Sequence, residues 1–486
     1  MSNYNLFQEE ENLLLENILK TYRYDILKSS RVDNDGFKKI IQIEFVITST
    51  CNLKCEYCYL QKFADELVPP SCRDEKTIIR NLKLFLNFWK EQNFKCNLDL
   101  FSGEIWHTDF GIEILNIILD YVKDGLTIYN ITIPSNSSFI FSDKYDIIRN
   151  LIYEFRKIGT NLVFSASVDG MILEDTTRPF KDPNYKNIRT EEYYIKLFEF
   201  CKEFGFGFHP MLAAYGIEKW IDNWNWWVDF FLKHYKNDYL AAYNKIMILE
   251  VRNNDWTEEK LQYFKKFQDY YYNWVWEKVA NKNPEIMTKI ITKTEEEKYG
   301  QNYSILQTME SDNVINCSIG RALIIRLGDL AILPCHRTAY DKYIYGHYII
   351  EDDKITGKVK AKNTLMPIIC NIGNVNNMFS KCHSCDIQNV CFKGCIGSQI
   401  ENMREPTLCI PCICELEHLR IINNCRNMAK TGVLKFIQNE LKQRESILSK
   451  ISIEEEELPV RRTLVQYYTN LENLVALSQA YGVIYE

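Results

Sequence analysis

Three cysteines lie close together near residue 50, in the segment Cys51-Asn-Leu-Lys-Cys55-Glu-Tyr-Cys58. The C-x3-C-x2-C spacing brings three thiolates into one loop, where they can bind three irons of a [4Fe–4S] cube. Cys72, the next cysteine, is fourteen residues farther along and is not placed to serve as a fourth ligand. One iron is therefore left open for a substrate or cofactor.

A loop of structural cysteines, or an incomplete zinc site, is the alternative for this triplet. Structural zinc sites take four ligands, usually arranged as two pairs. The triplet offers no second pair. We therefore favour the iron–sulfur interpretation.

Short apolar runs alternate with longer helical runs between residues 40 and 280. We expect strands at residues 40–48, 97–101, 127–134, 162–168, 206–212 and 246–251. We expect helices at residues 75–92, 108–123, 142–157, 191–204, 218–235 and 256–280. This alternation predicts a parallel sheet flanked by helices, either an open sheet or a partial barrel. In both arrangements the chemistry belongs at the carboxyl ends of the strands.

Polar residues follow the expected strands where such chemistry would occur. The second strand ends in Ser102-Gly103-Glu104, the third leads to Asn136, and the fourth ends in Ser165-Ala-Ser167-Val-Asp169-Gly170. Capped turns are the alternative explanation, since Asp-Gly pairs are common in turns. Glu250 and Arg252, at the end of the sixth strand, are interpreted as an ion pair.

The cysteine triplet resembles the signature of the radical S-adenosylmethionine (SAM) superfamily, C-x3-C-x-aromatic-C after the first strand of a partial (β/α)6 barrel. Cys51, Cys55, Tyr57 and Cys58 match it position by position. The resemblance implies that the open iron binds SAM through its amino and carboxylate groups. It also implies that the reduced cluster cleaves SAM to a 5′-deoxyadenosyl radical, which abstracts hydrogen from a substrate.

The same resemblance suggests SAM contacts at the other strand ends. Gly103 and Glu104 match a G-G-E motif that binds the SAM amino group, although Ser102 replaces its first glycine. Asn136 aligns loosely with a T-N-G motif. Ser167 and Asp169 match S-x-S-x-D-G residues near the SAM ribose, and Arg178 is a candidate partner for the SAM carboxylate, with a surface arginine as the alternative.

Residues 317–425 contain eleven of the seventeen cysteines. The run Cys382-x2-Cys385-x5-Cys391-x3-Cys395 resembles the centre of the SPASM domain, which holds two auxiliary [4Fe–4S] clusters. Upstream, ten residues separate Cys317 from Gly328 as in that pattern, but six rather than four separate Gly328 from Cys335. One or two zinc sites are the alternative, because C-x2-C is also a zinc motif.

The SPASM resemblance implies that the ligands of the two auxiliary clusters interleave. The first cluster would take Cys317, Cys335 and Cys395, with Cys370 as the candidate fourth ligand. The second would take Cys382, Cys385 and Cys391 with one of Cys409, Cys412 and Cys414, of which Cys409 is favoured. With the SAM-binding cluster, the resemblance implies three [4Fe–4S] clusters in all.

Composition and domain pattern agree with a cytoplasmic enzyme. The net charge of −7 argues against nucleic-acid binding, and neither a signal peptide nor an 18-residue apolar run is present. Because cytosolic thiols stay reduced, clustered cysteines indicate metal rather than disulfides. We expect a partial (β/α)6 TIM-like barrel with a C-terminal cysteine-rich domain and helical extensions, in five segments: 1–40 helical, 41–280 core, 281–316 linker, 317–425 SPASM and 426–486 helical.

Radical SAM–SPASM enzymes mostly modify peptides or proteins. We therefore expect a maturase of a ribosomally synthesised peptide that forms thioether or carbon–carbon cross-links, with flavodoxin or ferredoxin as reductant and no membrane partner. A small-molecule dehydrogenase is the second hypothesis, and a non-catalytic zinc or iron–sulfur protein the third. Formylglycine formation on a sulfatase is disfavoured, because those maturases tend to have an acidic base where this chain has His336.

Overall fold

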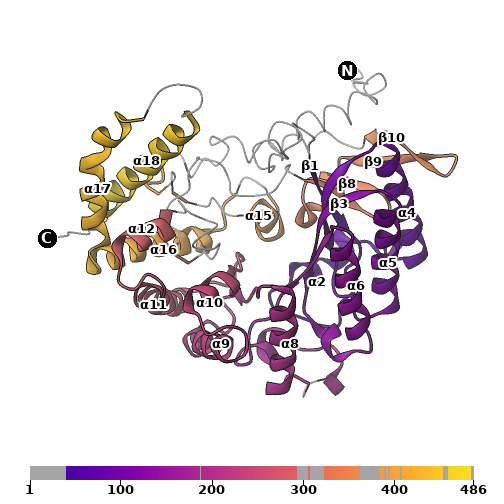
Figure 1. Ribbon diagram of the computed structural model, residues 1–486, viewed down its shortest axis with the longest axis horizontal. Helices are drawn as coiled ribbons and strands as arrows, with labels where there is room; N and C mark the ends of the chain where they lie inside the picture. The colour runs from indigo at the N-terminus through magenta and orange to yellow at the C-terminus, as the bar shows by residue number, and fades with distance from the viewer. Residues whose placement is uncertain are drawn as a thin grey trace. The chain divides into compact units, whose positions relative to one another are not determined.

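The computed structural model describes residues 40–185, 188–292, 305–306, 322–361, 382, 384–387, 390–391, 395–405, 408–451 and 458–482. The chain forms two compact units (Figure 1). Unit 1 comprises Met1–Ser167, Pro179–Ile188 and Cys317–Gly373, and unit 2 comprises Val168–Arg178, Arg189–Asn316 and Asn374–Glu486. The core expected at 41–280 contributes to both units, and the five predicted segment boundaries stay predictions. The helix expected before residue 40 lies outside the described residues.

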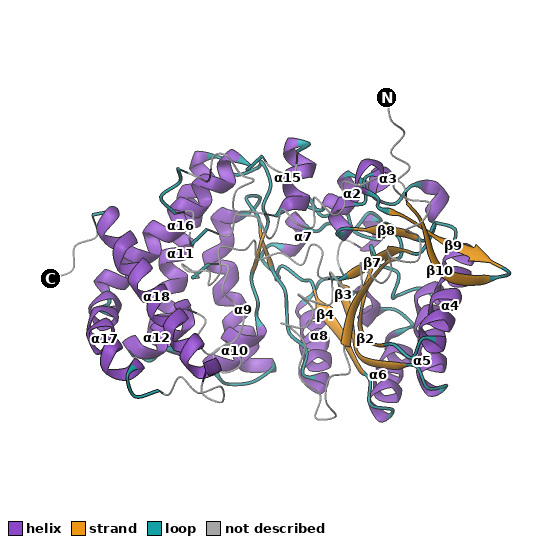
Figure 2. Cartoon of the chain, turned by 90° about the horizontal axis from the view of Figure 1, so that it is seen from above, coloured by secondary structure: helices purple, strands orange, loops and turns teal. Residues whose placement is uncertain are grey.

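Unit 1 is built on parallel strands in the order of the sequence. They are β1 (Ile40–Val46), β2 (Lys95–Phe101), β3 (Thr127–Ser135) and β4 (Asn161–Ala166). The crossover helices, which run along one face of this sheet (Figure 2), are α4 (Glu75–Glu91), α5 (Asp109–Lys123) and α6 (Tyr145–Lys157). The carboxyl ends of all four strands therefore meet at one edge.

Local sequence explains where these helices begin and which face they bury. Asp74 caps α4 by accepting from the Thr77 N–H, and Thr108 caps α5 by accepting from the Gly111 N–H. The buried side of α4 meets the sheet where Trp89 stacks on Phe45 of β1, with ring centroids 5.2 Å apart. This apolar contact fixes the helix over the first strand.

Strands from the cysteine-rich half of the chain extend the same sheet. β7 (Leu323–Arg326) pairs in parallel with β1, and an antiparallel run continues the sheet through β8 (Ala331–Leu333), β9 (Gly346–Glu351) and β10 (Lys354–Ala361). The strand order is β10-β9-β8-β7-β1-β2-β3-β4. Residues 323–361 thus share a sheet with the core, which the sequence pattern did not predict.

Unit 2 contains the last two expected strands, β5 (Met211–Leu212) and β6 (Leu249–Glu250), which pair in parallel with each other. Around them lie α7 (Glu174–Thr177), α8 (Glu191–Phe204), α9 (Trp220–His234), α10 (Tyr239–Lys245), α11 (Glu258–Trp274) and a π-helical turn at Val275–Val279. The segment expected as a linker from residue 281 contains α12 (Pro284–Thr292).

The C-terminal helices of unit 2 are α15 (Ile396–Met403), α16 (Pro411–Lys430), α17 (Val433–Leu448) and α18 (Leu458–Ala480). Buried amides join α16 to α11. Gln268 donates to the Arg420 carbonyl at 2.7 Å and to Asn424 Oδ1 at 2.9 Å, and the side chain of Asn423 donates to Asp269 at 2.8 Å. These bonds hold α16 in place, and α16 carries several of the candidate metal ligands.

The predicted fold class is confirmed. The protein is an α/β chain with a parallel-rich sheet and helical C-terminal extensions, in which four of the expected strands join the large sheet and two form a small one.

The described short elements are the helices α2 (Tyr59–Lys62) and α3 (Ala64–Leu67) and the 3-10 turns Pro70–Cys72, Ser138–Phe141, Pro183–Tyr185, Ile217–Lys219, His336–Thr338 and Asp341–Tyr343. None of the described helices combines the length and apolar character needed to cross a bilayer.

Candidate functional site

The loop after β1 carries the first three cysteines, which are half-buried and form no disulfide. Leu53, between them, is buried, and the Lys54 N–H donates to the Pro179 carbonyl at 3.0 Å, which holds the loop in place. The Leu53 N–H lies 3.4 Å from Cys51 Sγ, where it can donate to the sulfur.

Gly103, just past the end of β2, packs against the backbone of this loop. A Cβ atom at Gly103 would lie 2.0 Å from the carbonyl oxygen of Thr50 and 2.9 Å from that of Ser49. The Gly103 N–H donates to the Thr48 carbonyl at 2.9 Å, and the Glu104 N–H donates to the Thr50 carbonyl at 2.7 Å. Only glycine permits this approach, which fixes the residue preceding Cys51.

Glu104 is buried beside the end of β3. The Ser135 hydroxyl lies 3.1 Å from both of its carboxylate oxygens, and the Asn136 N–H donates to it at 2.5 Å. The Asn136 side chain donates to Asn52 Oδ1 at 2.8 Å and lies 3.9 Å from Cys51 Sγ. The structure thus brings two predicted SAM contacts, Glu104 and Asn136, to the cysteine loop.

The donor types at this site fit the predicted cofactors. The hydroxyl of Ser102 is buried and has no hydrogen-bond partner among the described residues. Three unbridged thiols suit the irons of a cluster, and the Glu104 carboxylate suits the ammonium group of SAM. Tyr57, in the same loop, is half-buried. Its role toward SAM stays a prediction.

The remaining predicted SAM contacts have protein partners in the structure. The Ser167 N–H donates to the Ser135 carbonyl at 2.7 Å. Asp169, fully buried, accepts from the Thr177 hydroxyl at 2.6 Å and the Met211 N–H at 2.9 Å. Arg178 lies 3.8 Å from the Asp169 carboxylate. The Met211–Asp169 bond ties the start of unit 2 to β5, and a role of Ser167, Asp169 and Arg178 toward SAM stays a prediction.

Residues 335–337 lie close to the cysteine loop. The His336 ring stacks on Phe101, the last residue of β2, with centroids 4.2 Å apart. The Nδ1 atom of His336 lies 2.7 Å from Glu44 Oε1, so it donates to that carboxylate and leaves Nε2 without a proton in the neutral ring. Arg337 lies over the ring of Tyr59, 4.1 Å from its centroid, and Cys335 is buried. Periodicity and spacing do not predict this proximity, because it depends on the pairing of β7 with β1.

Two acidic side chains stand opposite each other in the same sheet. Glu44 of β1 and Asp99 of β2 are register partners. Burial, and then the charge of Glu44, raise the pKa of Asp99 to about 6, although Gln42 donates to its carboxylate at 2.7 Å. Like charges in directly opposite positions oppose pairing. Protonation of Asp99 removes that repulsion.

Six cysteines in unit 2 line a single cavity of about 190 Å³. They are Cys382, Cys385, Cys391, Cys395, Cys409 and Cys414. None forms a disulfide, and the sulfurs of Cys382 and Cys409 are 3.8 Å apart. Isoleucine side chains complete much of the lining. A cavity lined with thiols and shielded by apolar groups fits the donor requirements of an iron–sulfur cluster.

Of the other predicted auxiliary ligands, Cys412 is described in unit 2 and does not line this cavity. Cys412 points to the carbonyl of Asn253, with its sulfur 3.3 Å from that oxygen. Cys335 belongs to unit 1. Cys317 and Cys370 lie outside the described residues. The interleaved ligand sets therefore stay a prediction.

Buried charges border the cysteine cavity. Arg252 pairs with Glu250 at 3.3 Å, as predicted, and with Glu417 of α16 at 2.7 Å. Burial raises the pKa of Glu250 to about 7. Burial alone would lower the pKa of Arg252, but Glu417, Glu250 and then the thiols of Cys391 and Cys395 raise it. The guanidinium thus supplies positive charge beside two candidate thiolate ligands.

Replacing Gly103 with alanine tests the backbone contact with the cysteine loop. The added methyl group must displace Thr50, so we expect Gly103→Ala to lower the free energy of unfolding by roughly 1–3 kcal/mol. Urea unfolding under anaerobic conditions measures this. Gly159→Ala is the comparison: an added Cβ there has nothing within 4 Å, and the φ of 86° alone opposes alanine, at about 1 kcal/mol or more, so Gly103→Ala should lose more stability than this. An equal loss in both variants would contradict the close-contact argument.

Asp99→Asn tests the buried acid pair through pH. Because the folded pKa, about 6, exceeds the unfolded value near 3.9, the proton on Asp99 stabilises the fold below about pH 4, and this contribution is lost as pH rises through 6. Between pH 4 and 8 the wild type should lose roughly 2–3 kcal/mol more than the asparagine variant. Urea unfolding across this range measures the difference. Parallel pH profiles of stability for the wild type and Asp99→Asn would contradict a raised pKa of Asp99. Asp146→Asn, at an exposed position, is the control and should follow the wild-type profile.

No family model matches this chain, and no curated protein matches it. Among solved structures, it resembles that of SuiB from Streptococcus suis, crystallised with S-adenosylmethionine bound, with 14% sequence identity and a TM-score of 0.42. The match covers 80% of this chain and 77% of the SuiB chain. At this level of similarity, the match does not assign a function to the chain.

Proposed function

We propose that this protein is a radical SAM enzyme that modifies a ribosomally synthesised peptide by forming a thioether or carbon–carbon cross-link. One observation carries the proposal. Three unbridged thiols at C-x3-C-x2-C spacing follow the first strand of a parallel sheet, in a loop packed against Gly103 and next to the buried Glu104. When bound, the [4Fe–4S] cluster and SAM would supply a 5′-deoxyadenosyl radical that abstracts hydrogen from the peptide.

The chain's own residues would bind and orient these groups. Cys51, Cys55 and Cys58 would hold three irons, and the Gly103–Thr50 contact would keep the first of these thiols in place. Glu104 would accept hydrogen bonds from the SAM ammonium, since its carboxylate is buried and already oriented by Ser135. Flavodoxin or ferredoxin is the proposed electron donor.

The cysteine cavity of unit 2 would hold auxiliary iron–sulfur chemistry. Its six thiols exceed what one cluster needs, so it can supply ligands to a complete cluster and contribute to a second. Arg252 would offset the negative charge of the thiolates, because its guanidinium is buried beside Cys391 and Cys395. The cavity and the buried guanidinium beside it support the proposal that this part of the chain holds auxiliary iron–sulfur clusters, as a SPASM domain does.

A second candidate is dehydrogenation of an alcohol or similar small substrate, which the His336–Glu44 pair favours. In such an oxidation the 5′-deoxyadenosyl radical would take a hydrogen atom, an auxiliary iron–sulfur cluster would take the remaining electron, and a base would take the proton. The Nε2 atom of His336 can accept a proton while Nδ1 stays bonded to Glu44, 2.7 Å away. A cross-linked peptide product, identified by mass spectrometry, would exclude this candidate as the main activity.

Alanine substitution of Cys51, Cys55 and Cys58 tests the proposed SAM-cleaving cluster. Each single variant, and the triple variant, should reduce dithionite-dependent release of 5′-deoxyadenosine to the background measured without protein, because the open-iron cluster needs all three thiolates. Chromatography of the anaerobic reaction measures the release. Cys201→Ala, in the buried core of α8, is the control and should keep the activity. Release by the triple variant would rule out the assignment.

Cys409→Ala and Cys412→Ala separate a cavity ligand from a neighbour that does not line the cavity. Cys409 contacts Cys382 across 3.8 Å, whereas Cys412 points to the Asn253 carbonyl. We expect Cys409→Ala to lower the iron content of the reconstituted protein, and Cys412→Ala to leave it unchanged. Iron and sulfide analysis measures both variants. Equal iron in the Cys409 variant and the wild type would remove Cys409 from the ligand set.

A further inference from the structure

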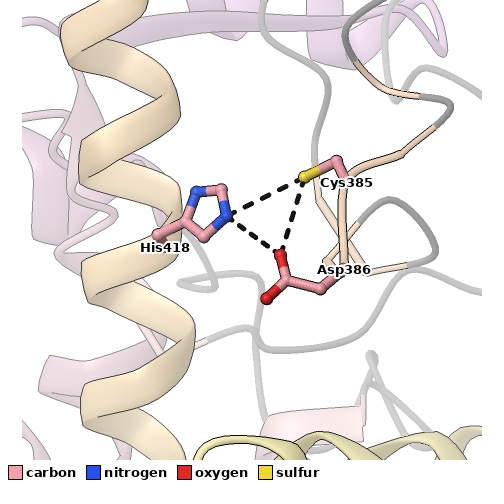
Figure 3. Close-up of side chains that lie close together, drawn as sticks. All are labelled: Cys385, Asp386 and His418. Carbon is pink, nitrogen blue, oxygen red and sulfur yellow. Dashed lines mark hydrogen bonds and ion pairs between the residues drawn. The ribbon is translucent and has the colours of Figure 1, made fainter.

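A cysteine, an aspartate and a histidine converge on one point in unit 2 (Figure 3). The Nε2 atom of His418, on α16, lies 3.8 Å from Cys385 Sγ and 3.2 Å from Asp386 Oδ1. Cys385 Sγ lies 3.9 Å from the same carboxylate oxygen. The three ligand atoms therefore form a nearly equilateral triangle, and they belong to residue types that together bind first-row transition metals.

The size of this triangle is that of ligands sharing a single ion. With zinc bonds of about 2.3 Å to sulfur and about 2.0–2.2 Å to nitrogen and oxygen, tetrahedral angles place neighbouring ligand atoms about 3.3–3.6 Å apart. The observed sides of 3.2, 3.8 and 3.9 Å lie within about 0.3 Å of that spacing, so one ion can contact all three atoms.

The hydrogen bonds of His418 leave its Nε2 atom facing a carboxylate, where a metal ion can bind. Nδ1 lies 2.8 Å from the Cys414 carbonyl, which can only accept, so Nδ1 carries a proton. A neutral imidazole then has a lone pair on Nε2, and this lone pair faces the Asp386 carboxylate. Either a second ring proton or a metal ion must lie between them. The bond from Nδ1 to a carbonyl is the usual support of a metal-binding histidine.

Asp386 is oriented in the same way. The Tyr481 hydroxyl donates at 2.7 Å to Asp386 Oδ2, which is not the oxygen that contacts His418. The other oxygen, Oδ1, is left facing His418 and Cys385. Two of the three candidate ligands thus have a supporting hydrogen bond on a polar atom other than the one at the shared centre. Such outer partners fix ligand orientation in metal sites.

Solvent can reach this centre. The side chains of His418 and Asp386 are 35% and 55% exposed. His418 lines both the cysteine cavity and an open depression of about 720 Å³ that also contains Lys265 and Arg426. A metal can therefore enter from solvent, and a fourth coordination position can be filled by water or an external ligand.

We propose that Cys385, Asp386 and His418 bind one zinc ion with an open fourth position, separate from the iron–sulfur chemistry of the chain. Zinc accepts sulfur, nitrogen and oxygen ligands in one tetrahedral site, and three protein ligands with one open position is its pattern in catalytic centres. The assignment takes Cys385 out of the auxiliary cluster and leaves the other five cavity cysteines for iron. The zinc proposal does not rest on SAM cleavage, because its three ligands would bind zinc and not the irons of the SAM-binding cluster.

The test uses the full-length, anaerobically purified protein with its iron intact, supplemented with zinc and desalted. Elemental analysis should find about one zinc per chain, and zinc-edge X-ray absorption should show one sulfur with the rest nitrogen or oxygen. Cys385→Ala and His418→Ala should lose the zinc and keep the iron. Tyr481→Phe, which removes only the supporting hydroxyl, should weaken zinc binding roughly tenfold or more in a chelator competition.

His347→Ala is the matched control, since His347 contacts Asp329 in unit 1, and it should keep its zinc. Three outcomes would overturn the proposal: zinc retained in the His418 variant, a zinc site with only sulfur ligands, or loss of iron instead of zinc in the Cys385 variant. The last would return Cys385 to the cluster. Because zinc and iron are measured directly, a failure here is distinct from a failure of SAM cleavage.

Discussion

The close contact between Gly103 and Thr50 is the constraint on which the first candidate site depends. The ends of β1 and β2 are paired in register as far as Val46 and Phe101, and the cysteine loop leaves one strand while Gly103 follows the other. Their backbones can hydrogen-bond only if no side chain separates them. The same contact sets the direction in which Glu104 leaves the sheet, so one glycine positions both the cluster loop and the carboxylate.

Much of unit 1 was predictable because its signals are local. Short apolar runs that alternate with amphipathic runs in the sequence predict the strands and helices of the first half. A parallel strand order then places Cys51, Glu104 and Asn136 at one edge of the sheet. The pairing of β7 with β1 was not predictable in this way. β7 has four residues and its partner lies nearly 300 residues earlier, so neither periodicity nor spacing identifies it. The position of His336 depends on that pairing and was missed with it.

Asp169 shows why a motif match and a binding role can differ. Glu104 and Asp169 both follow parallel strands and both are buried. Asp169 accepts from Thr177 and Met211 and lies near Arg178, so its charge is balanced within unit 2. The sequence shows that a carboxylate is present at each position. Which hydrogen-bond donors reach its oxygens depends on tertiary structure, because those donors come from distant parts of the chain. His418 and Asp386 likewise meet only because α16 packs against a loop thirty residues upstream in the chain.

In the proposed function, metal ligation stabilises the cysteine-rich part of unit 2. The described backbone hydrogen bonds between Cys382 and Cys391 are turn contacts, such as Cys391 N–H to Ile387. Thiols grouped around one cavity repel one another once they ionise, and the guanidinium of Arg252, which is also paired with Glu417, offsets part of that charge. In the proposed function, metal binding would remove the thiol protons and balance the charge, so its free energy would become folding free energy. The thiols face the shielded cavity, which suits iron and sulfide, whereas the exposed imidazole and carboxylate at its rim suit a harder ion that keeps a solvent ligand.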